Sequence, residues 1–173
     1  MNTQKLLLSS AIATSLLVMS GASFAASSGS MGSSSSGNVN ISASVQQKVK
    51  VSGLSDIALG TYSGTGALSG GTNACVYSNS PGQAYKVTAS VSNAASFQMS
   101  GSTDPSNAIN FGATWGGQAL TFNQAATGFT GSSSPNCGGS TNAAFNVSVD
   151  EPTMLAAAPD TYAATVDLLI EPA

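Results

Sequence analysis

Few residues of this 173-residue chain could do chemistry. Serine and threonine hydroxyls are frequent, but the chain has no histidine, so the commonest general base and the commonest transition-metal ligand are both missing. The acidic pair Asp150 and Glu151 is the best candidate for a calcium site, yet it lies in no DxDxDG loop and is expected to be solvated. These residue types predict no enzyme activity, no metal and no cofactor.

Cys75 and Cys137 are the remaining reactive side chains. They lack the CxxC spacing of redox-active or metal-binding pairs, and an even number of cysteines in an exported chain favours a disulfide. Joining them closes a loop of about 60 residues, which would stabilise the fold by roughly 4 kcal/mol if the effect is chain entropy alone. We therefore predict a structural disulfide between Cys75 and Cys137.

The first 25 residues predict export. Lys5 supplies a positive start, residues 6–18 are mostly apolar, and Ser23-Phe24-Ala25 offers the small residues that signal peptidase requires. We expect residues 1–25 to be removed as a signal peptide. No later segment reaches the roughly 18 continuous apolar residues of a membrane span, so the mature protein is expected to be soluble.

Charged residues are scarce in the rest of the chain. Besides Lys5, the chain has three lysines, no arginine and seven Asp or Glu residues, which gives the whole chain a formal net charge of −3. So few cations provide no electrostatic footprint for nucleic acid or anionic lipid. Residues 26–37 form a Ser/Gly-rich tether, which cannot bury enough apolar surface to order itself.

A long alternating segment follows the tether. Its polar residues occupy the even positions, and only Gln47 breaks the phase. Its apolar residues are Val39, Ile41, Ala43, Val45, Val49 and Val51. Period-two alternation predicts a strand, and this one is much longer than the usual strand of about five or six residues. Such a strand can pair within its own domain as an ordinary edge strand, or it can pair with a neighbour's sheet.

The remainder of the chain predicts short strands and turns. Residues 61–73 are rich in Gly, Ser and Thr and are expected to form a loop, as is the segment that carries Cys137. Gly116-Gly117 is a two-residue hairpin signal, and residues 154–158 could form a single helical turn. Strands are expected around residues 54–60, 74–77, 85–91, 97–99, 109–115, 120–122, 145–149 and 162–170.

About eight short strands separated by turn signals predict an antiparallel β-sandwich. The apolar phase of each strand should face a shared core, with the polar phase in water. The predicted core residues are Val87, Val91, Phe111, Trp115, Phe145, Val147, Val166 and Leu168.

Four stretches in this order resemble the pilins of the bacterial chaperone–usher pathway. They are NVNISASV from residue 38, GLSDIALG from residue 53, ATWGGQALTF from residue 113 and PDTYAATVDLLIEP from residue 159. The resemblance covers most of residues 38–173 and is to the major subunits of the alternate (CFA/I-like) and archaic branches. The ending Glu171-Pro172-Ala173 lacks the aromatic residue that is frequent in the classical branch.

The resemblance implies an all-β, incomplete immunoglobulin-like sandwich that is completed by donor-strand exchange. A periplasmic chaperone would fill the open groove first, and the N-terminal strand of the next, identical or related subunit would replace it at an outer-membrane usher. Residues 38–46 would be the donor strand and residues 47–173 the pilin domain. The donor contacts would be Val39, Ile41, Ala43 and Val45, and the edge of the acceptor groove would be Tyr162, Ala164, Val166, Leu168 and Ile170.

The resulting fimbria would lie on the cell surface and support adhesion and biofilm formation. A second function class stays open, that of an exported β-sandwich that does not polymerise, similar to spore-coat-U proteins or to small carbohydrate-binding modules. Self-assembly separates the two classes, because a pilin purified without its chaperone should polymerise or aggregate, whereas a self-contained sandwich should stay monomeric.

Overall fold

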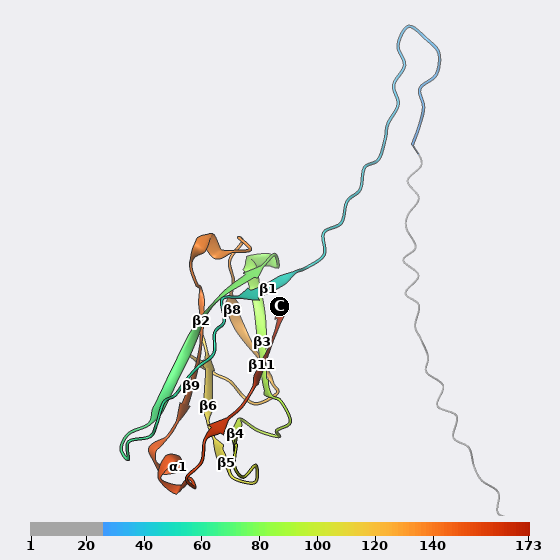
Figure 1. Cartoon of the computed structure of the whole chain (residues 1–173). Coiled ribbons are helices and arrows are strands. Elements are labelled where there is room, and N and C mark those ends of the chain that lie inside the picture. Colours follow the sequence, from blue (N-terminus) through green and yellow to red (C-terminus); the bar gives the residue numbers. More distant parts are fainter. Residues whose placement is uncertain (1–25) are drawn as a thin grey trace, which may run out of the picture. The chain divides into compact units, whose positions relative to one another are not determined.

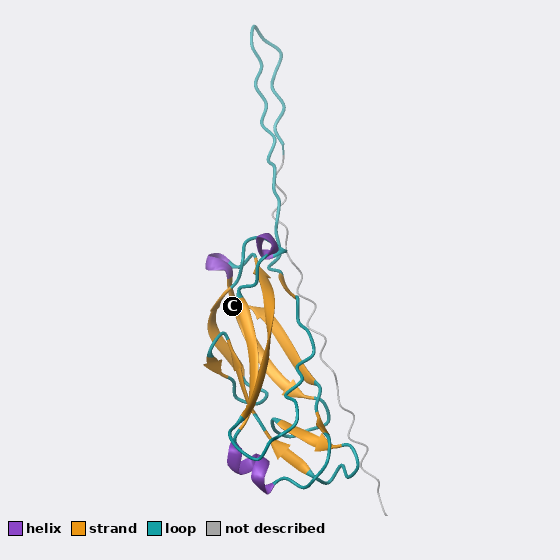
Figure 2. Ribbon diagram, turned by 60° about the vertical axis from the view of Figure 1, so that its left-hand side comes forward, coloured by secondary structure: helices purple, strands orange, loops and turns teal. Residues whose placement is uncertain are grey.

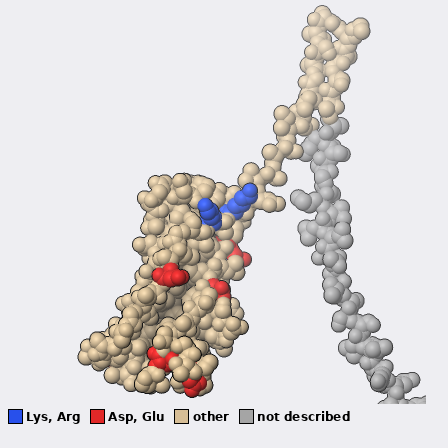
Figure 3. All heavy atoms as spheres, viewed as in Figure 1, with Lys and Arg blue, Asp and Glu red and all other residues tan. Residues whose placement is uncertain are grey.

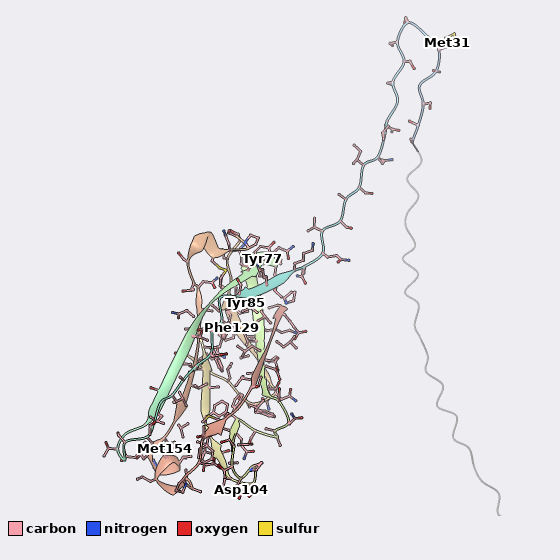
Figure 4. The ribbon with its side chains drawn as sticks, viewed as in Figure 1. Met31, Tyr77, Tyr85, Asp104, Phe129 and Met154 are labelled. Carbon is pink, nitrogen blue, oxygen red and sulfur yellow. A yellow bond between two sulfur atoms is a disulfide. The ribbon has the colours of Figure 1, made fainter. Side chains whose placement is uncertain are left out.

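The computed structural model describes residues 26–173 (Figure 1), so the predicted signal peptide 1–25 lies outside the described residues. The chain divides into two units at Ser44 and Val45. In the first unit, residues 26–44 are exposed and contain no strand of their own. Two backbone hydrogen bonds of 3.2 and 3.1 Å between Ser27 and Asn38 close the Ser/Gly-rich stretch into a loop, with the exposed Met31 at its turn (Figure 4).

The second unit is built almost entirely of β-strands. Its strands are β1 (Val49–Ser52), β2 (Leu68–Ser78), β3 (Ala84–Val91), β4 (Gln98–Gly101), β5 (Ala108–Asn110), β6 (Gly112–Trp115), β7 (Gln118–Ala119), β8 (Ala125–Thr130), β9 (Ala143–Val149), β10 (Tyr162–Ala163) and β11 (Val166–Pro172). Its helical elements are two 3₁₀ turns, at Pro81–Gln83 and Cys137–Gly139, and the short helix α1 (Glu151–Ala156).

The strands form one five-stranded sheet, in the order β1-β2-β9-β6-β7, and two three-stranded sheets, β11-β3-β8 and β10-β4-β5. All pairings between these strands are antiparallel. Side chains from all three sheets meet in one apolar core, which makes the unit a sandwich (Figure 2). The predicted all-β, antiparallel sandwich is therefore confirmed.

Two aromatic residues join the layers at the centre of the core. Trp115 on β6 is fully buried, and its Nε1 donates a 3.0 Å hydrogen bond to the hydroxyl of Tyr85 on β3. Tyr85 in turn stacks on Phe129 with ring centroids 5.5 Å apart. Because the indole N–H has a buried partner, Trp115 fills the core without leaving an unpaired donor.

Five of the eight predicted core residues are buried: Val87, Val91, Phe111, Trp115 and Phe145. The other three, Val147, Val166 and Leu168, pack against the core but are only partly buried. Their alternation was interpreted correctly, but part of their surface borders an open groove, described below.

The long strand predicted over residues 39–51 is shorter in the structure. Only β1 joins a sheet, by pairing with residues 75–78 of β2, and residues 39–47 belong to no strand. The alternation of apolar and polar residues indicates that one face is suited to burial. A strand also needs a neighbouring strand to pair with its backbone N–H and C=O groups. Within the described part of the chain, residues 39–45 have no such neighbour.

Two segments that were predicted as loops contain strands. β2 begins at Leu68, inside the expected loop 61–73, and β8 lies in the expected loop before Cys137. At Gly70 a Cβ atom would lie 2.7 Å from Cγ2 of Ile57, so the missing side chain lets the neighbouring chain approach β2 closely. Glycine here serves close packing within a strand, which local propensity does not reveal.

The predicted turns and crosslink occur where expected. Gly116 and Gly117 connect β6 to β7 with φ values of +56° and +84°, which glycine adopts without strain. A disulfide joins Cys75 on β2 to Cys137, with their Cα atoms 5.8 Å apart. Asp150, the weak calcium candidate, instead caps α1 by accepting a 3.1 Å hydrogen bond from the Thr153 amide.

Candidate functional site

The second unit has an open groove of about 1040 Å³. One wall is the segment 54–62, which follows β1, and the other is the segment 157–168, which runs from the end of α1 into β11. Apolar side chains from both layers of the sandwich form its floor, among them Met99, Ile109, Phe111, Phe145 and Val147. A groove with an apolar floor between two extended walls suits an extended chain whose apolar side chains face that floor.

The second wall contains the residues that the sequence predicted as a groove edge. Tyr162, Ala164, Val166 and Leu168 all line the groove. Ile170 does not line it and is buried in the core, 9% exposed. The strand is interrupted between β10 and β11, so Ala164 and Thr165 belong to neither strand.

The first wall was predicted as a strand, but residues 53–60 belong to no strand. The backbone N–H of Ser55 donates to the Thr72 hydroxyl of β2 at 2.9 Å, so a side chain replaces the expected strand partner. Ile57 and Leu59 pack over Gly70 of β2. This segment therefore runs beside β2 as an extended wall, and its spacing of apolar residues was the only sequence signal for that role.

The groove reaches α1 at one end, where Asp160 fixes the wall. Its carboxylate accepts hydrogen bonds from the backbone N–H groups of Thr103, Asp104 and Thr161, at 2.7 to 3.2 Å. These donors, led by the Asp104 amide, lower the pKa of Asp160 to about 2. The Asp160 carboxylate thus connects the loop after β4 to the wall before β10 by hydrogen bonds. The sequence did not predict this role.

Tyr62 brings an unpaired polar group to the first wall. Its hydroxyl oxygen is inaccessible to water and has no hydrogen-bond partner among the described residues. Burial raises the pKa of this hydroxyl, and the negative charge of Glu151 raises it further. The phenol is therefore neutral at physiological pH.

The predicted donor residues lie outside any sheet. Val39, Ile41 and Val45 are 76%, 92% and 85% exposed, and Ala43 is also exposed. Large apolar side chains that are spaced two apart and exposed in this way are unusual on a protein surface.

Asn79, just after β2, holds the chain where this exposed segment joins the second unit. Its backbone N–H donates to the Lys48 carbonyl at 3.1 Å, and its side-chain oxygen accepts from the Lys48 N–H at 2.6 Å. Its side-chain nitrogen donates to the Gln46 carbonyl at 2.9 Å. The residues that Asn79 holds, Gln46 and Lys48, lie on either side of Gln47, which breaks the alternation. The break in the alternation therefore coincides with the place where the segment is hydrogen-bonded to the second unit.

Residues 26–173 contain no cluster of three or more His, Cys, Asp or Glu side chains that could hold a metal ion. No helix in that part of the chain is both long and apolar enough to cross a membrane. The described residues do place together in one chain a groove with an apolar floor and an exposed segment with alternating apolar side chains.

The fold is similar to that of a fimbrial protein. A chain of a chaperone–tip adhesin complex that is vital for synergistic activation of CFA/I fimbriae biogenesis superimposes with a TM-score of 0.51 at 12% sequence identity. The match covers 72% of this chain and 41% of that one, so this protein spans less than half the length of the matched chain. Comparison with models of known families and with characterised protein sequences finds no match.

Proposed function

We propose that this protein is a structural subunit of a chaperone–usher surface fimbria and assembles by donor-strand complementation. In this function, residues 38–46 of one copy occupy the apolar groove of the next. The observation that carries the proposal is the pairing of an open apolar groove with an exposed, one-faced strand segment in the same chain.

The two parts match in length. The segment 38–46 and the groove wall 54–62 each contain nine residues, which extend to about 30 Å at roughly 3.3 Å per residue. A strand in the groove would lie between that wall and β11, where its backbone could pair with edges that have no strand on the groove side.

Burial supplies the driving force for this contact. Moving Val39, Ile41 and Val45 from water into the groove would contribute roughly 1.5–3 kcal/mol for each side chain before the cost of ordering the segment. Because the segment and the groove are different surfaces, the contact is head-to-tail and generates a filament.

The likeness to a chain of a chaperone–tip adhesin complex supports partners of the same kind. We expect a periplasmic chaperone to cover the groove before assembly, an outer-membrane usher to exchange it for the next subunit, and the finished fibre to serve adhesion and biofilm formation at the cell surface. No enzymatic step is required of the subunit.

A grafted strand tests the proposal. Residues 38–47 (NVNISASVQQ) are added after Ala173 through a short flexible linker, in a chain from which residues 26–46 have been deleted. Because the groove lining stops at Leu168, five residues before Ala173, a short linker should return the graft into the groove of its own chain and give a stable monomer. Thermal unfolding and size-exclusion chromatography measure the result.

A matched graft with Ile41→Asp inside the added copy is the control, because it places an unpartnered charge in the apolar groove. The grafted chain should unfold well above this control. Equal unfolding temperatures, or a deleted chain that folds reversibly as a monomer without any graft, would contradict the proposal and favour the non-polymerising class.

A further inference from the structure

A second inference rests on the proposed function and concerns how consecutive copies contact each other outside the groove. Its starting point is the root of the segment, defined as Gln46, Lys48 and Asn79. Three hydrogen bonds between Asn79 and the backbone of Gln46 and Lys48 hold these residues to the body. Gln46, the last residue of the donor segment, therefore stays at the junction with its own body, and Val45 is the first residue beyond this anchor.

The short free length forces the two bodies together. One residue of extended chain spans about 3.3 Å, so a strand that begins at Val45 leaves almost no slack between the root and the groove that it enters. The surface around the root must then lie against one end of the neighbour's groove.

The two ends of the groove differ. Its lining stops at Leu54 and Leu168, near the place where β1 lies beside β11. At the other end the lining continues to Met154 of α1 and to Asp160. Met154 and Asp104 lie together at this end, far from Tyr85 (Figure 4).

The charges of the two surfaces are complementary. Lys48 of the root and Lys50 of the adjoining β1 are exposed and form no ion pair within residues 26–173. Lys86, in contrast, pairs with Glu171 at 3.5 Å. Figure 3 shows the lysine side chains close to β1, and it shows acidic side chains at the α1 end as well as along the body. The acidic residues of the α1 end are Asp104, Asp150, Glu151 and Asp160.

We infer that the root of one copy docks directly against the α1 end of the next, with Lys48 and Lys50 facing that acidic surface. The opposite direction would place the root next to the neighbour's own lysines, which repel it. The donor segment would then run antiparallel to β11, as it does in the graft after Ala173.

Charge reversal and rescue test the docking surface. Fibre growth of the full chain is followed by light scattering at low and at high salt. The double variant Lys48→Glu/Lys50→Glu should slow growth about tenfold at low salt, because complementary charge raises association rates by ten- to a thousandfold. High salt should abolish the difference, since 1 M salt screens beyond about 3 Å.

Rescue identifies the partner surface. Adding Asp104→Lys/Glu151→Lys to the Lys48→Glu/Lys50→Glu variant should restore most of the rate of fibre growth. The control is Gln118→Glu/Ala119→Glu, a pair of exposed positions on β7, and it should leave fibre growth unchanged. Asn79→Ala should loosen the root, seen as faster hydrogen exchange of the Lys48 amide and as a wider spread of subunit spacing in the fibre.

The two proposals fail separately. The grafted chain fills its groove internally, so Lys48→Glu/Lys50→Glu should leave its unfolding temperature unchanged. If the graft stabilises the chain but the charge variants grow at the parent rate, the docking inference is wrong and donor-strand assembly stands. If the graft does not stabilise the chain, the proposed function itself is wrong.

Discussion

Two stretches of this chain have the same alternating pattern and opposite surroundings. In β3, Tyr85, Val87, Ala89 and Val91 are all buried, and each residue between them is partly exposed. In the segment 38–46, every apolar residue at the corresponding phase is exposed to water. The two stretches have nearly the same sequence pattern, but only β3 belongs to a sheet.

The difference is one of neighbours. β3 pairs with β11 on one side and β8 on the other, so its backbone is hydrogen-bonded and its apolar face is covered. Residues 39–45 have no strand partner within the described part of the chain. Alternation therefore shows that a face is suited to burial, and it does not show which chain buries it.

The largest effect is expected when the same charge is placed in both stretches, which tests whether only β3 is buried in its own domain. Val87→Asp should destabilise the domain by roughly 5–8 kcal/mol, about 3–5 for an unpaired buried charge and about 1.5–3 for the lost side chain. Ile41→Asp should change the stability of a single copy by less than about 0.5 kcal/mol, because this position is exposed. Urea unfolding of both variants at low protein concentration measures this.

A destabilisation by Ile41→Asp of more than about 1 kcal/mol would mean that the segment packs on its own domain. Both stretches would then be buried within their own domain, and the conclusion that only β3 is buried there would be wrong.

A smaller effect is expected at the hydrogen-bonded centre of the core. Trp115→Ala should cost about 3–5 kcal/mol through the cavity that it leaves. Tyr85→Phe keeps the ring but leaves the Trp115 N–H unpaired, which should cost about 1–3 kcal/mol. Leu169→Ala, at an exposed position, is the control in the same denaturant series. Equal values for all three variants would show that burial does not decide the cost.

The smallest expected effect concerns acid stability at the α1 end. The hydrogen bonds to Asp160 lower its pKa from 3.8 to about 2. Since the folded-state pKa is depressed, the stabilisation is complete above about pH 4 and disappears as the pH falls through about 2. Asp160→Asn should therefore flatten the pH dependence of the unfolding temperature between these values.

Asp56→Asn is the matched control, because the Asp56 carboxylate makes no hydrogen bond among residues 26–173. An unaltered acid profile in Asp160→Asn would mean that its hydrogen bonds do not persist in solution.

Elements that depend on residues close together in the chain could be predicted from the sequence. The alternation of residues 85–91 predicted β3, the glycine pair predicted the β6–β7 hairpin, and the two cysteines predicted the crosslink. These features follow from a period of two, from φ values that glycine prefers, and from an even number of cysteines in a chain that the sequence predicts to be exported.

Features that join distant parts of the chain could be seen only in the folded protein. The glycine-containing start of β2 was missed because Gly70 is favourable there only when Ile57 packs over it. The hydrogen bonds of Asn79 and Asp160 that hold distant segments involve backbone groups 31 to 57 residues away in the sequence. Such contacts leave no periodic signal, because the residues that satisfy one another's hydrogen bonds meet only after the sheets have packed.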